Sequence, residues 1–206
     1  MLEDIRKSVL AGILIATGGC VYLACASAGI GWIGSLLFAV GLYTICMYGF
    51  NLYTGKVGYI ADNFKDVKYI GKVALILAVN LLTTFAVGVL VRFSLPEIAA
   101  KAADAYASKL AAEPVKWVVS SVFCGMLMFI AVDTWKRGSK LGVFLCVPTF
   151  ILSGFDHSIA NSFYNGAALS ENTFTLRNVL FVAVVVLGNA VGGMLIPLLK
   201  GKEKAS

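Results

Sequence analysis

Long apolar runs alternate with short polar segments along the chain. A helix needs about 20 consecutive apolar residues to cross a bilayer. Six runs approach this length, although a polar interruption divides the fifth. The pattern therefore predicts an all-α integral membrane protein with six transmembrane helices. The predicted spans cover roughly residues 8–26, 32–50, 71–93, 117–135, 141–169 and 177–199.

Two polar, glycine-containing segments interrupt this pattern at membrane depth. The first, 51–58, follows the second span, and the second, 153–161, lies within the fifth. Backbone that leaves the helical hydrogen-bond pattern is tolerated at this depth only where protein covers it or where it lines a wet cavity. We therefore expect the second and fifth helices to be broken around an internal site.

The polar stretch between the third and fourth spans runs from Ser94 to Lys116. It is rich in alanine, lysine and glutamate, which are strong helix formers. Pro96 and Pro114 stand near its two ends. This stretch is predicted to form a surface helix.

Composition supports a membrane protein throughout. The 206 residues are 59% hydrophobic and only 14% charged, with a mean hydropathy of +0.87. Globular proteins carry about a quarter charged residues. We expect residues 1–206 to form a single transmembrane channel or transporter domain. The net charge of +6 does not indicate a nucleic-acid partner, because the basic residues are scattered at the ends of apolar runs.

The distribution of lysine and arginine predicts the orientation in the membrane. Cytoplasmic loops carry an excess of these residues. Eleven fall on the side of the two termini: Arg6, Lys7, Lys65, Lys68, Lys72, Lys136, Arg137, Lys140, Lys200, Lys202 and Lys204. Five fall on the opposite side: Arg92, Lys101, Lys109, Lys116 and Arg177. Both termini are predicted to be cytoplasmic, in a multi-pass plasma (inner) membrane protein.

An internal repeat relates the two halves of the chain, about 8–93 and about 117–199. Gly-Phe-Asn opens the first break at Gly49, and Gly-Phe-Asp opens the second at Gly154. A single asparagine follows each break in the next span, Asn80 and Asn189. Each half has three spans, so the halves would insert with opposite topology. Inverted repeats with broken helices are typical of transporters and channels, with the binding site between the breaks.

The second break contains His157, the single histidine of the chain. An ionisable residue at membrane depth is a functional candidate by default. The alternative is a core histidine whose ring nitrogen bonds a neighbouring carbonyl. The surrounding break favours a functional role.

Other chemistry is poorly supported by the sequence. The five cysteines lie inside apolar runs, and none forms a CxxC pair. With one histidine available, no metal site, cofactor site or disulfide framework is predicted. A membrane enzyme would need a ligand cluster or a nucleophile–base pair, so we do not expect an enzyme.

Three segments resemble the formate/nitrite transporter family. They are Gly-Phe-Asp-His-Ser-Ile-Ala-Asn at 154–161, Leu-Tyr-Thr-Gly at 52–55 and Leu-Gly-Asn-Ala-Val-Gly-Gly at 187–193. The resemblance implies an aquaporin-like arrangement of six helices and a homopentamer with one pore per protomer. It also implies transport of small monovalent anions of the formate, nitrite or hydrosulfide type.

The resemblance further implies roles for individual residues. His157 would be the central pore histidine, Thr54 its hydrogen-bonding partner, and Asn189 would face the same space. Lys116 would be the vestibule lysine. The constrictions would be formed by Leu42, Leu52 and Val132 on the cytoplasmic side and by Phe38 and Phe150 on the outer side.

Each of these residues also has a structural interpretation. Lysine at a helix end commonly marks the membrane edge, which applies to Lys116. Thr54 could cap the helix that restarts after the break. The two asparagines could join helices by hydrogen bonds. The constriction residues could be ordinary packing or lipid contacts.

Physical chemistry suggests how such a pore would work. An unpaired anion pays a large desolvation cost in a dry apolar constriction, whereas a neutral weak acid crosses far more easily. A histidine side chain ordinarily titrates near pH 6.5, so it is a candidate proton donor to the anion. A polar stepping stone is the other possibility. The alternative function is a neutral-solute channel of the aquaporin type. That class predicts Asn-Pro-Ala motifs at the breaks, and neither break contains one.

Overall fold

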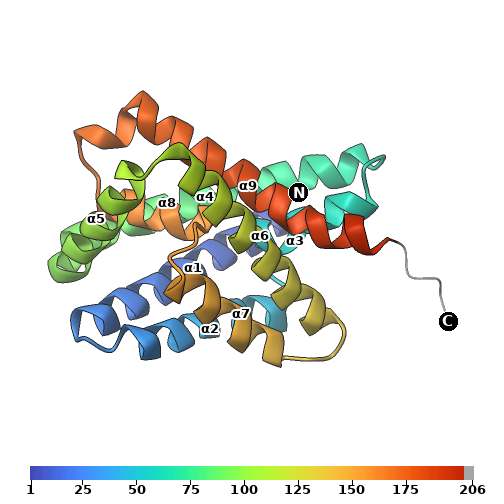
Figure 1. The fold of residues 1–206 in the computed structure, drawn as a ribbon, viewed down its shortest axis with the longest axis horizontal. Helices are drawn as coiled ribbons and strands as arrows, with labels where there is room; N and C mark the ends of the chain where they lie inside the picture. The colour runs from blue at the N-terminus through green and yellow to red at the C-terminus, as the bar shows by residue number, and fades with distance from the viewer. Residues whose placement is uncertain (202–206) are drawn as a thin grey trace.

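The computed structural model describes residues 1–201 and is all-helical over that range (Figure 1). The elements are α1 (Leu2–Ser27), α2 (Gly31–Tyr48), α3 (Tyr53–Lys56), the 3-10 helix η1 (Val57–Asp62), α4 (Val67–Ser94), α5 (Pro96–Ala111), α6 (Pro114–Lys136), α7 (Leu141–Leu152), α8 (Ser158–Ala167), the 3-10 helix η2 (Glu171–Phe174) and α9 (Leu176–Lys200). The predicted all-α membrane fold is confirmed.

Five described helices, α1, α2, α4, α6 and α9, are long and apolar enough to cross a membrane. The fifth predicted span, 141–169, is divided as expected: α7 has 12 residues, α8 has 10, and the segment between them is not helical. The first predicted break, 51–58, also lies directly after the end of a long apolar helix. There α2 ends at Tyr48, and the chain continues as the short α3 and η1.

Two helices begin earlier than their apolar runs. α1 starts six residues before the predicted 8–26 span, with Glu3 and Asp4 in its first turn. Acidic side chains are favourable there because they face the positive end of the helix dipole. α4 starts at Val67, and the Asp66 carboxylate caps it by accepting the Tyr69 N–H at 3.0 Å. Hydropathy marks the membrane-buried part of a helix, whereas capping residues set its ends.

The predicted surface helix, 94–116, is two helix segments in the structure. α5 begins with Pro96, and α6 begins with Pro114. Proline suits the first helical turn because its missing N–H would have no helical partner there. α5 also differs from a simple surface helix, because Ala99, Ala102 and Tyr106 are buried. One face of α5 therefore packs into the protein.

The two halves of the chain interlock. α1 packs against α2 and α4, and α6 packs against α7 and α9. The helices that follow the breaks pack across the halves: α8 lies along α4, and η1 lies along α9. Backbones approach closely at these contacts. A Cβ atom at Gly166 of α8 would lie 2.2 Å from the Phe85 carbonyl oxygen of α4. Small residues permit this kind of close helix packing in membranes.

The outward faces of the long helices are apolar. Leu82 on α4, Phe93 on α4 and Leu187 on α9 are each more than 60% exposed in the single chain. Such faces suit contact with lipid or with another subunit. In Figure 1, α5 and the start of α9 lie at one end of the molecule and the C-terminus lies at the other. We call these the α5 side and the terminus side.

Candidate functional site

The two breaks have the same backbone conformation. Gly49 follows the last residue of α2, and Gly154 lies two residues after α7, with φ angles of 67° and 68°. This left-handed region is accessible to glycine because it has no Cβ atom. Each break ends in an extended residue that stands at the N-cap of the next helix, Leu52 before α3 and His157 before α8. Leu52 and His157 therefore occupy equivalent positions.

Asn80 of α4 satisfies the backbone of the first break. Its Oδ1 accepts the Tyr53 N–H at 2.9 Å. Its Nδ2 donates to the carbonyl oxygens of Ser8 at 2.8 Å and Asn51 at 3.1 Å. The side chain is fully buried. One amide thus joins α1, the break and α4.

Asn189 of α9 does the same for the second break. Its Oδ1 accepts the Ser158 N–H at 2.8 Å. Its Nδ2 donates to the carbonyl oxygens of Ser121 and Asp156, both at 2.8 Å. Because backbone groups bond both the oxygen and the nitrogen of this amide, Asn189 fixes the second break against α6. It does not line either of the cavities described below.

His157 and Thr54 meet between the breaks. The distance from His157 Nε2 to Thr54 Oγ1 is 2.9 Å, and both side chains are buried. The other ring nitrogen, Nδ1, accepts the N–H of Ala160 at 3.1 Å and so caps α8. A nitrogen that accepts a hydrogen bond carries no proton. In the neutral ring the proton is therefore on Nε2, which donates to Thr54.

A small cavity of about 100 Å³ opens beside His157 on the α5 side. Phe38 and Phe150 both line it, as does His157. The two phenylalanine rings meet edge to face with centroids 6.0 Å apart, and Phe150 stacks on the His157 ring at 5.5 Å. The residues predicted for the outer constriction thus lie together against the histidine.

A lysine stands at this cavity, but it is Lys109 of α5. Its Nζ donates to Asp156 Oδ1 at 2.7 Å and to the Gly154 carbonyl oxygen at 3.4 Å. Asp156 is 3% exposed. The same carboxylate also accepts from Asn161 Nδ2 at 3.0 Å and from the Ser120 hydroxyl. A buried carboxylate next to the break is thereby balanced by one lysine.

Lys116, which the resemblance predicts as the vestibule lysine, does not line this cavity. It is exposed in the first turn of α6, outside the lining of the cavity. Pro114 begins α6 at a point where Lys116 faces outward. Lys109 lies one turn from Tyr106 on the packed side of α5 and so reaches Gly154. The helical spacing of Ala102, Tyr106 and Lys109 is the sequence signal that could have found it.

A larger cavity of about 370 Å³ opens on the terminus side. Leu42, Leu52 and Val132, the three residues predicted for the cytoplasmic constriction, all line it. Lys56 and Lys136 line it as well, and sequence reasoning did not single them out. The Lys136 ammonium lies 3.3 Å from the centre of the Tyr59 ring, a favourable cation–π contact. Two cations thus stand at this mouth.

The two cavities share no lining residue. Phe38 and Leu42, one turn apart on α2, line opposite cavities. Both are no more than 2% exposed, as is Leu52. The arrangement is a short apolar partition, with a lysine on the α5 side and two on the terminus side, and a histidine–threonine pair within it. It can separate two aqueous compartments while offering one polar contact in the middle.

The sequence and the fold were both compared with those of known proteins. A sequence model of the formate/nitrite transporter family matches residues 2–200. No curated protein sequence matches the chain. A solved structure described as an FNT family ion channel is similar with a TM-score of 0.82 at 20% identity, covering 97% of this chain and 88% of that one. A pentameric formate channel with formate bound gives 0.77 at 20% identity, covering 93% and 92% respectively. At this identity the structural likeness concerns the fold.

Proposed function

The chain belongs to the formate/nitrite transporter family, and we propose that it conducts small monovalent anions of weak acids across a membrane. The proposal rests on one observation: a buried histidine–threonine pair lies in an apolar partition between two cavities that lysines line. Formate is the first anion to test, because one similar structure is described with formate bound. Nitrite and hydrosulfide have the same charge and similar size. We propose transport and not catalysis.

The lysines concentrate anions at the two mouths. Each cavity is small and has apolar walls, and a low-dielectric wall strengthens the field of a nearby charge. Lys109 acts on the α5 side, although Asp156 offsets part of its charge. Lys56 and Lys136 act on the terminus side. The apolar residues of the partition then oppose a bare ion, since its hydration would be lost there.

His157 meets the permeating species as a hydrogen-bond donor. Donating a proton outright requires the imidazolium form, in which both ring nitrogens carry hydrogen. A proton on Nδ1 would face the N–H of Ala160, which now donates to that nitrogen. Protonation of Nδ1 would therefore break the hydrogen bond from the Ala160 N–H that caps α8. The neutral ring instead offers its Nε2–H, shared with Thr54, to an anion or a neutral acid in the partition.

We also propose how the chain is arranged in the membrane and how its copies assemble. The matching hydrogen bonds of Asn80 and Asn189 support inverted repeats of about 8–93 and 117–199, with six crossings in all. A homopentamer with one pore per protomer accords with the similar channel described as pentameric. The excess of lysine and arginine supports cytoplasmic termini. Membrane lipid covers the remaining apolar faces.

Flux into proteoliposomes tests the function directly. Purified protein is reconstituted, and a gradient of formate, nitrite or hydrosulfide is applied, with glycerol as the neutral solute. We expect uptake of at least one of the anions well above that of protein-free liposomes. Glycerol uptake without anion uptake would favour the neutral-solute channel instead. Protein-dependent flux of neither class would exclude the proposal.

A further inference from the structure

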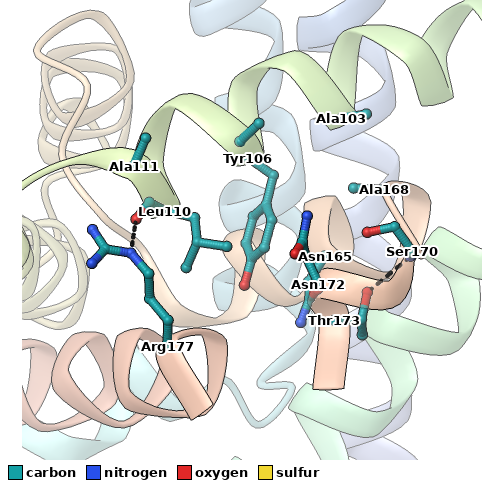
Figure 2. Close-up of a pocket in the computed structure, with 11 residues that line it drawn as sticks. Ala103, Tyr106, Leu110, Ala111, Asn165, Ala168, Ser170, Asn172, Thr173 and Arg177 are labelled. Atoms are coloured by element: carbon teal, nitrogen blue, oxygen red, sulfur yellow. Dashed lines mark hydrogen bonds between the residues drawn. The ribbon is translucent and has the colours of Figure 1, made fainter. Parts of the chain in front are cut away.

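A third cavity, larger than the other two, lies between α5, the end of α8 and the start of α9, away from the proposed conduction path (Figure 2). Its volume is about 440 Å³, the size of pockets that hold drug-sized ligands and far larger than formate needs. It shares no lining residue with either pore cavity. We call it the α5–α9 cavity. It is open to the outside on the α5 side.

An unpartnered polar group points to a ligand in this cavity. Asn165 of α8 is 7% exposed and lines the cavity. Its Oδ1 is fully buried and has no hydrogen-bond partner among the described residues, so a ligand reaches this oxygen once the side-chain amide turns it toward the cavity. Buried polar atoms in folded proteins nearly always have partners. In Figure 2 the Asn165 side chain stands between Tyr106 and Ala168, facing the cavity.

A cation stands at the other end of the cavity. Arg177 lies in the first turn of α9 and donates through Nε to the Leu110 carbonyl oxygen at 2.8 Å and through Nη2 to that of Ala112 at 2.9 Å. Its guanidinium also lies 4.9 Å from the Trp117 ring. These contacts fix its position while leaving other N–H groups of the guanidinium for an anion. The N-terminus of α9 adds positive potential beside it.

The wall between these two groups is apolar. Ala103, Ala107 and Ala111 follow one another at four-residue intervals on the same face of α5 and line the cavity. A fitting ligand would therefore carry an anionic oxygen group for Arg177 and a hydroxyl for Asn165, joined by a short carbon chain. A hydroxyl both donates and accepts, so it satisfies the asparagine amide in either orientation.

An apolar stripe on α9 begins beside the cavity. Leu176, Leu180, Ala183 and Leu187 are exposed and recur at helical spacing away from Arg177. Such a stripe offers a track for acyl chains below a bound head group. Basic pockets between membrane helices are suited to anionic lipid head groups. We propose that the α5–α9 cavity binds the head group of an anionic phospholipid that carries a free hydroxyl, as phosphatidylglycerol does. The proposal does not depend on the transported substrate.

Native mass spectrometry of the delipidated oligomer in detergent tests this proposal. Phosphatidylglycerol and phosphatidylcholine with the same acyl chains are added separately, and glycerol 3-phosphate serves as the soluble form of the same chemistry. We expect phosphatidylglycerol to be retained roughly fivefold better, the ratio that one basic residue contributes near a membrane surface. Ala107→Phe fills the cavity and should abolish the preference. Ala100→Phe, at an exposed alanine of α5 outside the cavity, is the matched control.

A second variant separates binding from folding. Asn165→Leu removes the unpartnered amide, so the lipid-free protein should keep its melting temperature or gain slightly. The rise in melting temperature caused by phosphatidylglycerol should be lost. Equal retention of the two lipids, or retention by Ala107→Phe as in Ala100→Phe, would overturn the proposal. Stabilisation by glycerol 3-phosphate without a lipid preference would show that the cavity binds a soluble phosphate and not a lipid, and would overturn the proposal. Loss of the oligomer in Ala107→Phe alone would place the cavity at a subunit contact and also overturn it.

Discussion

Replacing His157 by asparagine distinguishes the two roles open to this side chain. The histidine caps α8 through Nδ1 and contacts Thr54 through Nε2. Asparagine is among the best N-cap residues, and its Oδ1 can accept the Ala160 N–H in place of Nδ1. Its Nδ2 can still donate, but from a shorter side chain. Asparagine does not bind a proton near neutral pH.

The expected magnitudes follow from these contacts. The cap is retained, and loss of the Thr54 contact costs about 1 kcal/mol of unfolding free energy. The oligomer should therefore stay folded. A hydrogen bond to a charged group is worth about 1.5–3 kcal/mol, so losing it in the partition should lower anion flux roughly 10- to 100-fold. If His157 acts as a neutral donor, this reduction should be the same at every pH.

The assay is anion flux per folded oligomer in liposomes, at several pH values between about 5 and 8. The ratio of His157→Asn flux to wild-type flux is compared across this range, with chromatographic monodispersity as the folding control. Thr54→Val should lower flux less, because it removes the partner and leaves the ring donor. A ratio that changes with pH would refute the neutral-donor role and favour proton donation. Wild-type flux in well-folded His157→Asn would remove this residue from the mechanism.

Three further predictions address the rest of the site. Asn189→Leu removes the side-chain partner of the Ser158 N–H and the Asp156 carbonyl in the second break, at about 1–3 kcal/mol each, so its melting temperature should fall sharply; a wild-type melting curve would contradict the positioning role. Lys109→Gln should reduce anion flux at low salt, whereas Lys116→Gln should leave it unchanged; the reverse order would favour Lys116 as the vestibule lysine. A single cysteine at Lys101, in a cysteine-free background, should react with an impermeant thiol reagent outside intact cells. One at Lys68 should be protected; labelling at Lys68 with protection at Lys101 would invert the proposed topology.

The apolar pattern was sufficient to predict the membrane fold and the positions of both breaks. Hydropathy is a property of each short segment, so the spans and their interruptions at Gly49 and Gly154 can be located without any tertiary contact. The same local information singled out His157, because a lone ionisable residue in an apolar setting is visible in the sequence alone. The ends of α1 and α4 were less well placed, since capping contacts and not hydropathy decide them.

Tertiary structure decided what each side chain does at the site. Lys109 and Lys116 look alike in sequence, and only the packing of α5 brings Lys109 to Asp156. Asn189 was singled out in the sequence by its place after the second break, and only the fold shows that its amide bonds backbone groups of that break and of α6. The proton of His157 is assigned to Nε2 by the Ala160 N–H, which the folded backbone places at Nδ1. Residue type and local pattern establish which groups are available, whereas their partners come from segments distant in sequence, whose approach depends on helix packing.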